Sequence, residues 1–354
     1  MSEFLRTPTS LSNTLHGARP LAEAVKELYA EGQTDYSLDP IVLEQANGTP
    51  AGRIKDGDAV VFCCRRGERE IQLTEAFTDP NLDQFPREPF TILPFVILTL
   101  YHDKFKDLPV AFAPSRVKET LAEVVSRAGL RQAHISESEK FAHVTFFLNG
   151  GNGLPFPGEE DIRVPSLKGV PFDKFPELSL AEVSGKVIEQ LQKGTDLVIT
   201  NFANGDVIGH TSNVDAKIQC VEFVDQHLGE VMRAERSAGY VILITADHGN
   251  IEETLTDEGD AHVSHTTNPV PVFVIDSRSD QLIDPAPGKL ADIAPTILQI
   301  MGFPKPGLMT GESLVSGHMF GSQRKVLLVI LDGWGISGNP VQDPIAVGRT
   351  PIWD

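Results

Sequence analysis

Three apolar runs in this chain are each followed by acidic residues or histidine. The runs DLVIT, YVILIT and VLLVIL lead to Asp206, to Asp247 with His248, and to Asp332. Apolar runs of this length, bounded by Gly, Asn and Asp, are typical of buried strands in a parallel sheet. Ligands bind beyond the carboxyl ends of such strands. We therefore expect these side chains to gather at one rim of a sheet.

Two further histidines lie close to these residues in the sequence. His210 follows Asp206 by four positions, which places both side chains on one face of a helix, and His265 precedes a proline-bounded apolar run. Carboxylates with imidazoles suit divalent ions such as Mn²⁺ or Zn²⁺, and two adjacent ions can clamp a phosphoryl group. Each residue alone has an ordinary structural explanation. Their convergence from separate loops predicts a two-metal hydrolase or phosphotransferase site.

Three basic residues have the chemistry to bind phosphate. Lys140, in ESEKFAHVTFF, precedes an apolar run over 143–148 that we expect to be a strand, and its ammonium group would neutralise a transferred phosphoryl group. Arg66 and Arg69 leave another expected strand close together, a spacing that suits bidentate binding of phosphate or carboxylate. Outside such a context, all three side chains would be ordinary solvated surface residues.

Composition excludes several classes of protein. The net charge of −19 over 354 residues argues against a nucleic-acid binder, which needs a basic face. No apolar run reaches the roughly 18 residues of a membrane span, and the start of the sequence lacks the pattern of a signal peptide. Three cysteines make no disulfide framework, and they fit a reducing cytoplasm.

The elements that position these residues alternate along the chain. Helical periodicity appears in residues 21–31, 117–129, 180–194, 214–239 and 288–302. Strands are expected near residues 143–148, 196–200, 240–245 and 270–275. This alternation predicts an α/β fold with a mainly parallel sheet and helices on both faces.

Composition also divides the chain into segments. The expected segments are a loosely ordered start (1–16), a smaller α/β domain (17–103), a main domain (104–314), a linker (315–323) and a final segment (324–354). That final segment opens with VLLVIL, the pattern of a central strand. A buried strand placed after a linker indicates that the chain order is permuted.

Several motifs together resemble cofactor-independent phosphoglycerate mutase, a family of the alkaline phosphatase superfamily. The motifs are NGDVIGH, TADHGN, SHTTNPVPV, SESEKFAHVTFFLNGG, FPGE and VLLVILDGWG. The resemblance implies an alkaline phosphatase-like main domain and a partial transferase domain over residues 17–103. It also implies conversion of 3-phosphoglycerate to 2-phosphoglycerate through a phosphoserine intermediate, with two Mn²⁺ ions, or Zn²⁺ or Co²⁺ in their place.

The same resemblance implies roles for individual residues. The implied metal ligands form two sets, one of Asp206, His210 and His265 and the other of Asp247, His248 and Asp332. Three basic residues are implied to contact a small phosphorylated substrate, namely Lys140, which stabilises the phosphoryl group, and Arg66 and Arg69, which bind the rest of the substrate. Neither a nucleic acid nor a membrane is implied as a partner.

Two departures separate this chain from the family pattern. The family's opening segment comes last here, and the middle segment is missing. That segment carries the nucleophilic serine in a GNSEVGH-like motif, which occurs nowhere in this sequence. Three interpretations stay open: a mutase component completed by another polypeptide that carries the missing segment, a metal-dependent phosphohydrolase, and a non-catalytic metal-binding fragment.

Overall fold

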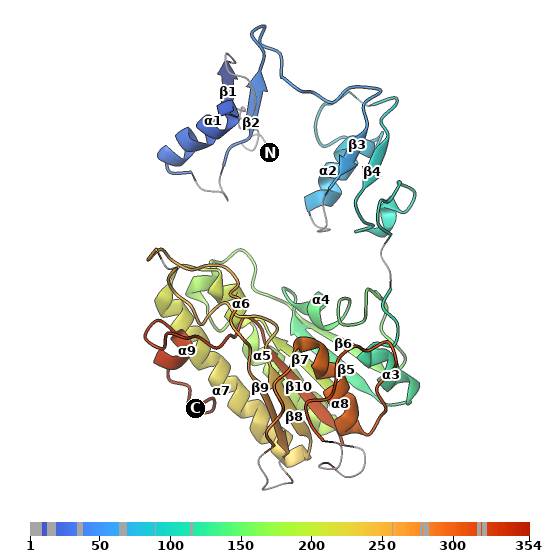
Figure 1. Cartoon of the computed structure of the whole chain (residues 1–354), viewed down its shortest axis with the longest axis vertical. Coiled ribbons are helices and arrows are strands. Elements are labelled where there is room, and N and C mark those ends of the chain that lie inside the picture. Colours follow the sequence, from blue (N-terminus) through green and yellow to red (C-terminus); the bar gives the residue numbers. More distant parts are fainter. Residues whose placement is uncertain are drawn as a thin grey trace. The chain divides into compact units, whose positions relative to one another are not determined.

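The chain divides into two compact units, residues 1–114 and 115–354. A computed structural model (Figure 1) describes residues 9–12, 19–33, 38–63, 69–88, 90–113, 116–256, 258–276, 278, 283–316, 320 and 324–354. The division falls later than the boundary predicted after residue 103. The reason is that backbone hydrogen bonds join residues 109–112 to Ile97 and Leu98 of the first unit.

The first unit contains two small parallel sheets. Its elements in chain order are β1 (Thr9–Ser12), α1 (Arg19–Ala30), β2 (Ile41–Glu44), β3 (Val60–Phe62), α2 (Arg69–Thr78), β4 (Phe95–Ile97) and the 3₁₀ helix η1 (Asp103–Phe105). Strand β1 pairs with β2 and β3 pairs with β4, each pair joined through a helix as parallel strands require. Phe62 and Phe77 pack against Phe95 beneath the second sheet, with ring centroids 5.6 Å apart in each pair.

One expectation for this unit is wrong. Residues 1–16 were expected to be loosely ordered, yet Thr9–Ser12 form β1, in register with Ile41–Glu44 of β2. Backbone pairing along a neighbouring strand overrides the polar, Ser/Thr-rich composition on which the expectation rested. The rest of that segment lies outside the described residues.

The second unit is built around one mixed sheet. Its elements in chain order are α3 (Leu121–Arg127), β5 (Gln132–Glu137), α4 (Phe141–Val144), β6 (Glu159–Val164), η2 (Phe172–Lys174), α5 (Leu180–Lys193), β7 (Leu197–Phe202), α6 (Asn204–Gly209), α7 (Val214–Ala238), β8 (Val241–Thr245), β9 (Val272–Asp276), η3 (Leu290–Asp292), α8 (Ile293–Met301), β10 (Val326–Leu331) and α9 (Pro344–Val347). Among the described residues, the strand order is β6-β5-β7-β10-β8-β9. All neighbours are parallel except β8 and β9.

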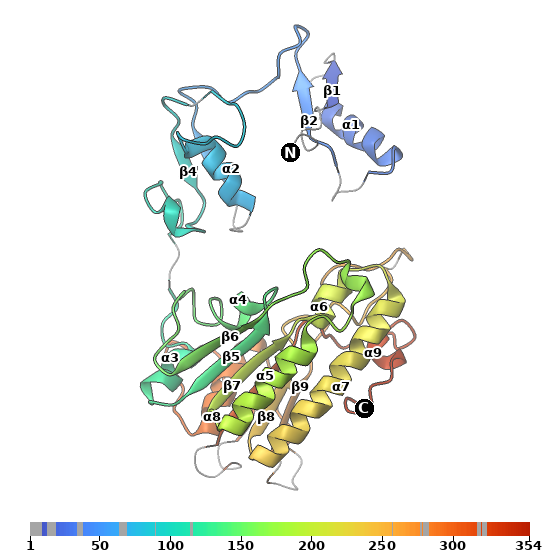
Figure 2. The same ribbon diagram turned by 180° about the vertical axis from the view of Figure 1, so that it is seen from behind.

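Helices cover both faces of this sheet, which confirms the predicted fold class. Helices α5 and α7 lie on one face, seen in front in Figure 2, and α3 and α8 contribute to the core on the other. Strand β10 shows how one strand serves both cores. Leu327, Val329 and Leu331 pack into the first core, and Val326 and Leu328 pack into the second. This strict alternation is the geometry of a strand buried on both sides.

Local sequence signals set the helix ends. Helix α7 begins after Asn213, whose side chain accepts a hydrogen bond from the backbone of Ala216, and it ends at the left-handed Gly239. Pro295 was expected to kink a helix or to begin one. It lies in the first turn of α8, where its missing N–H removes no helical hydrogen bond. No helix in the described part of the chain is both long and apolar enough to span a membrane.

The strand predicted over 143–148 is also wrong. Those residues form the end of the short helix α4 and the turns that follow it. The strand of this region is β5, whose six residues are all buried although four of them are polar. Buried partners satisfy such groups, because Gln132 donates to the Ala122 carbonyl and Ser136 to the Asn201 carbonyl. Lys140 therefore follows a strand, rather than preceding one.

Strand β10 occupies the centre of the sheet, although it comes after every other strand in the sequence. It pairs with β7 on one side and with β8 on the other. Part of the predicted linker packs on this domain, because Phe320 is buried and Val315 contacts the same core. Residues 317–319 and 321–323 of that linker lie outside the described part of the chain.

Replacing Leu327 by Ala tests this central position. Leu327 is fully buried between β7 and β8, so the substitution removes buried methyl groups and leaves a cavity. We expect the free energy of unfolding to fall by about 2–5 kcal/mol, measured by urea denaturation. Val341→Ala, at a side chain that is 82% exposed, is the control and should change stability little. Equal effects of the two substitutions would contradict a central β10.

Candidate metal centre

The carboxyl ends of three adjacent strands deliver the acidic residues of the candidate site. Asp206 lies on α6 just beyond β7, Asp247 follows β8, and Asp332 directly follows β10. These strands are neighbours in the sheet, in the order β7, β10 and β8, so their ends meet at one rim. The structure thus brings together all six residues that the resemblance implied as metal ligands.

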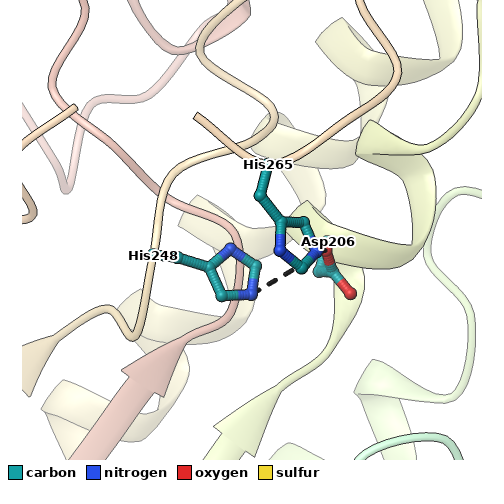
Figure 3. A group of neighbouring side chains, drawn as sticks. All are labelled: Asp206, His248 and His265. Carbon is teal, nitrogen blue, oxygen red and sulfur yellow. Dashed lines mark ion pairs between the residues drawn. The ribbon is translucent and has the colours of Figure 1, made fainter. Parts of the chain in front are cut away.

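Asp206 is the common neighbour of three histidines. Its Oδ1 atom lies 3.1 Å from Nε2 of His210, 3.0 Å from Nε2 of His265 and 4.0 Å from Nε2 of His248. Figure 3 shows Asp206 with two of them, His248 and His265, whose rings stack with centroids 3.8 Å apart. Helix α6 places His210 one turn beyond Asp206, as their spacing predicted.

A second group of ligand atoms shares His248 with the first. Nε2 of His248 lies 3.6 Å from Oδ2 of Asp247 and 3.6 Å from Oδ1 of Asp332. The ligand atoms of Asp206, His248 and His265 lie within 4.8 Å of one another, and so do those of Asp247, His248 and Asp332. His248 therefore sits between two sets of donors, at the centre of the site.

Hydrogen bonds orient two of the rings for metal binding. Nδ1 of His210 lies 2.8 Å from the Val263 carbonyl, and Nδ1 of His248 lies 3.1 Å from the Gly249 carbonyl. A carbonyl only accepts, so each Nδ1 donates its proton there, and displacement of the proton from Nε2 by a bound cation would leave the lone pair of Nε2 facing the carboxylates. Carbonyl partners of this kind typically orient metal-ligating histidines. The donor set of imidazole and carboxylate thus fits divalent cations.

Lys140 joins two of the strand ends electrostatically. Its Nζ lies 2.6 Å from Oδ2 of Asp206 and 2.8 Å from Oδ1 of Asp332, and its side chain is nearly buried. Burial alone would lower the pKa of Lys140, but attraction to Asp332 and Asp206 outweighs it and raises the pKa. The ammonium group therefore stays charged at the centre of the site.

Burial and charge affect the carboxylates in opposite directions. Burial, with repulsion from Asp247, raises the pKa of Asp332 to about 6, against the opposing effects of Lys140 and of a 2.6 Å hydrogen bond from Asn201. For Asp206, the raising effect of burial is outweighed by hydrogen bonds from His210, Lys140 and Asn250, and the pKa is lowered. A bound cation would stabilise both carboxylates as anions.

A buried carboxylate that the sequence analysis missed ties the loops together. Glu252 has no exposed surface, and its Oε2 accepts hydrogen bonds from the backbone of Asn250 at 2.7 Å and of Gly335 at 3.0 Å. Its Oε1 accepts from Asn268 at 2.9 Å and from Thr266. The loops that carry His248, His265 and Asp332 are thus anchored to one side chain. Glu252 lies two residues after the TADHGN motif, and this proximity was the available sequence signal.

Two glycines let the loops approach this closely. A Cβ atom on Gly205 would lie 2.4 Å from the Asp332 carbonyl oxygen, and one on Gly335 would lie 2.2 Å from Oε1 of Glu252. Real Cβ atoms do not approach other atoms so closely, so both positions require glycine. The contact at Gly205 brings Asp206 next to Asp332, and the contact at Gly335 lets Glu252 reach its backbone.

His143 is a second residue that the sequence analysis left without a role. It lies in α4, and burial, followed by repulsion from Lys140, lowers its pKa, while Asp247 and Asp206 act in the opposite direction. The charged groups that act on His143 thus include Lys140, Asp247 and Asp206 of the candidate site. His143 lies in the motif SESEKFAHVTFFLNGG. Because a strand was expected over residues 143–148, the sequence did not indicate that this side chain lies near the metal ligands.

A cavity opens beside the second group of ligands. It has a volume of about 550 Å³, and its lining includes Asp247, His248, Thr266 and Lys289. A space of this size admits a small phosphorylated molecule. Of the two arginines implied as substrate-binding, Arg66 lies outside the described residues, and Arg69 begins α2 in the first unit.

Comparison with known proteins gives a consistent result. The chain is 42% identical over 312 residues to the 2,3-bisphosphoglycerate-independent phosphoglycerate mutase of Symbiobacterium thermophilum, covering 87% of this chain and 59% of that protein. It is 43% identical over 296 residues to the protein of the same name from Desulforudis audaxviator, covering 83% and 57%. The chain therefore spans less than two thirds of the length of these relatives.

A solved structure and a family profile agree with these relatives. The crystal structure of Leishmania mexicana phosphoglycerate mutase at low cobalt concentration superimposes with a TM-score of 0.69 at 29% identity, covering 85% of this chain and 58% of that one. These similarities confirm the resemblance drawn from the motifs, and with the ligand clusters they indicate use of divalent metal. The profile of the Metalloenzyme superfamily matches residues 20–305. The chain belongs to the Metalloenzyme superfamily.

Proposed function

We propose that this chain is the metal-binding component of a phosphoglycerate mutase that converts 3-phosphoglycerate to 2-phosphoglycerate. The observation that carries the proposal is the convergence of Asp206, Asp247 and Asp332 with three histidines and Lys140 at one rim of the sheet. Relatives with about 42% identity bear the name of this activity. The cytoplasm is the compartment that we expect for such an enzyme.

The ligand sets proposed for two ions are those that the family resemblance implies. Asp206, His210 and His265 would hold one ion, and Asp247, His248 and Asp332 would hold the other, with His248 near both. Divalent ions there would supply the positive charge that polarises a phosphoryl group and activates its attacking nucleophile. Mn²⁺ is the ion that we favour, and Zn²⁺ and Co²⁺ suit the same mixture of imidazole and carboxylate donors.

The chain's own residues would orient the substrate and balance its charge. Lys140 lies between Asp206 and Asp332, so its ammonium group is placed to neutralise a phosphoryl oxygen that enters the site. Asn201 and Asn250 hold Asp332 and Asp206 by hydrogen bonds, which fixes their donor atoms before substrate arrives. Arg66 and Arg69 are proposed to bind the carboxylate or phosphate of the substrate.

The nucleophilic serine would come from outside this sequence. We infer that a complementary polypeptide supplies the missing middle segment with its GNSEVGH-like motif, and that the chain order is permuted relative to the family. The coverage of the relatives, 56–59% of their length, supports a missing segment. The position of β10 in the centre of the sheet supports permutation, because it shows that residues 326–331 belong to the metal-binding unit.

A coupled assay tests the proposed reaction. The purified chain would be supplied with 3-phosphoglycerate and Mn²⁺, alone and with a polypeptide that carries the missing segment, while enolase-coupled turnover and free phosphate are measured together. We expect turnover only with both polypeptides. Release of phosphate by the chain alone would instead establish the phosphohydrolase. Bound metal without either reaction in either mixture would leave a non-catalytic metal-binding fragment and contradict the mutase.

Replacing Asp247 by Ala tests the ligand assignment. The substitution removes an anionic donor from the set that includes His248 and Asp332, so we expect the Mn²⁺ content to fall by one ion per chain. Metal content would be measured after gel filtration. Asp260→Ala, at an exposed carboxylate in the loop that follows, is the matched control and should keep the full content. Unchanged metal content in the Asp247 variant would remove that residue from the site.

Replacing Lys140 by Met separates catalysis from metal binding. The ammonium group competes with cations for Asp206 and Asp332, so its loss should leave metal affinity unchanged or higher. Turnover in the reconstituted assay should nevertheless fall roughly 100- to 1,000-fold, as expected when a charge that stabilises a transition state is removed. Lys168→Met, at an exposed lysine, should alter neither quantity. Loss of metal together with turnover would show that Lys140 organises the ligands instead.

A further inference from the structure

A second cluster of histidine and carboxylates lies at the edge of the sheet, on strands β5 and β6. His134 of β5 stands opposite Asp161 of β6 in the parallel register. Glu159 precedes Asp161 by two positions, so both carboxylates project from the same face of β6. The side chains of His134 and Glu159 have no exposed surface. None of the three belongs to the metal centre described above.

Neighbouring hydrogen bonds fix the orientation of His134. The amide nitrogen of Gln132 donates to the Ala122 carbonyl at 2.9 Å, so the amide oxygen of Gln132 is turned toward the ring. That oxygen lies 3.3 Å from Nε2 of His134, which must therefore carry the proton. Burial lowers the pKa of His134 more than the charge of Glu159 and the Val144 carbonyl raise it, which favours the neutral ring. Its Nδ1 then presents a lone pair.

That lone pair faces negative charge instead of a donor. Nδ1 of His134 lies 3.2 Å from Oε1 of Glu159 yet forms no hydrogen bond, and Oδ1 of Asp161 is also buried without a hydrogen-bond partner. The ligand atoms of the three residues lie within 4.8 Å of one another. Two unpartnered acceptors beside a carboxylate are costly to bury unless a cation lies among them.

The surrounding charges do not supply that cation. Glu159 accepts hydrogen bonds from Asn149 at 2.6 Å and from the backbone of Phe156 at 2.8 Å, both neutral donors. Among the described residues, no lysine or arginine forms an ion pair with Glu159 or Asp161, and His134 is the basic side chain beside Glu159. Burial, with repulsion from Glu159, raises the pKa of Asp161 to about 7. The pair of carboxylates therefore lacks a compensating positive charge.

We propose that His134, Glu159 and Asp161 bind a divalent cation of the zinc class, which joins the edge strand β6 to β5. One imidazole and two carboxylates are a donor set that Zn²⁺ accepts, with water completing the coordination at the partly exposed Asp161. Gln132 and Asn149 act as outer partners that orient His134 and Glu159. The ion is structural, because it stabilises the edge of the sheet and does not depend on the proposed mutase reaction.

Metal content of the full chain tests the proposal without any activity measurement. The chain and its His134→Gln variant would be saturated with Zn²⁺, passed through gel filtration and analysed for bound zinc. We expect the variant to hold one ion fewer per chain, whatever the principal centre binds. Equal zinc content in the two proteins would overturn the proposal.

The chain contains a matched control for this substitution. His227 is also buried between two carboxylates, 3.0 Å from Glu177 and 3.1 Å from Glu230, but both of its ring nitrogens are hydrogen-bonded to them. His227→Gln should therefore keep the full zinc content. A loss of one ion in this variant too would show that the measurement reports general disruption, and would remove the support for a site at His134.

A second substitution, Asp161→Asn, distinguishes a metal ion from a proton and covers the case in which the His134 variant fails to fold. Without metal at pH 8, the neutral amide relieves the repulsion from Glu159, so the melting temperature should stay level or rise. With Zn²⁺, the variant should lack one ion and the part of the thermal stabilisation that this ion gives the parent. If parent and variant hold equal zinc and the variant is more stable in both conditions, a proton balances the cluster and the proposal is wrong.

Discussion

Mutual repulsion among three carboxylates is the constraint on which the metal-binding unit depends. Asp206, Asp247 and Asp332 converge because β7, β8 and β10 are adjacent and end at one rim. Among the described residues, Lys140 is the lysine that balances this charge, through ion pairs to Asp206 and Asp332. Such a concentration of buried negative charge is costly unless cations occupy the site. The folded chain thus places the carboxylates so that bound cations would stabilise it.

The loops withstand this repulsion because buried polar groups anchor them from behind. Glu252 gathers hydrogen bonds from three loops, and Asn201 and Asn250 hold the individual carboxylates. The side chains of Glu252, Asn201 and Asn250 have no exposed surface or almost none. Hydrogen bonds in buried networks of this kind restrict the motion of the groups that they join. Donor atoms are therefore positioned by the protein, and metal binding needs little reorganisation of the chain.

The sequence predicted the ligand-bearing rim well, because VLLVIL, YVILIT and DLVIT are apolar runs that end in metal-type side chains. The sequence did not predict β5, because four of the six residues of this buried strand are polar. The hydrogen-bond partners that allow the burial of Gln132 and Ser136 come from other elements. The sequence also did not predict the role of Glu252 or the pairing of His134 with Asp161. Both depend on which loops and strands become neighbours, and local periodicity carries no information about that.

The central place of β10 has a consequence for biosynthesis. Strands β7 and β8 leave the ribosome well before residues 326–331, and each lacks its partner along one edge until β10 emerges. Unpaired edges of apolar strands template intermolecular association. The nascent domain thus passes through a stage at which two fully buried strands, β7 and β8, are open to pairing with another chain, so we expect chaperones to protect these strands until β10 emerges.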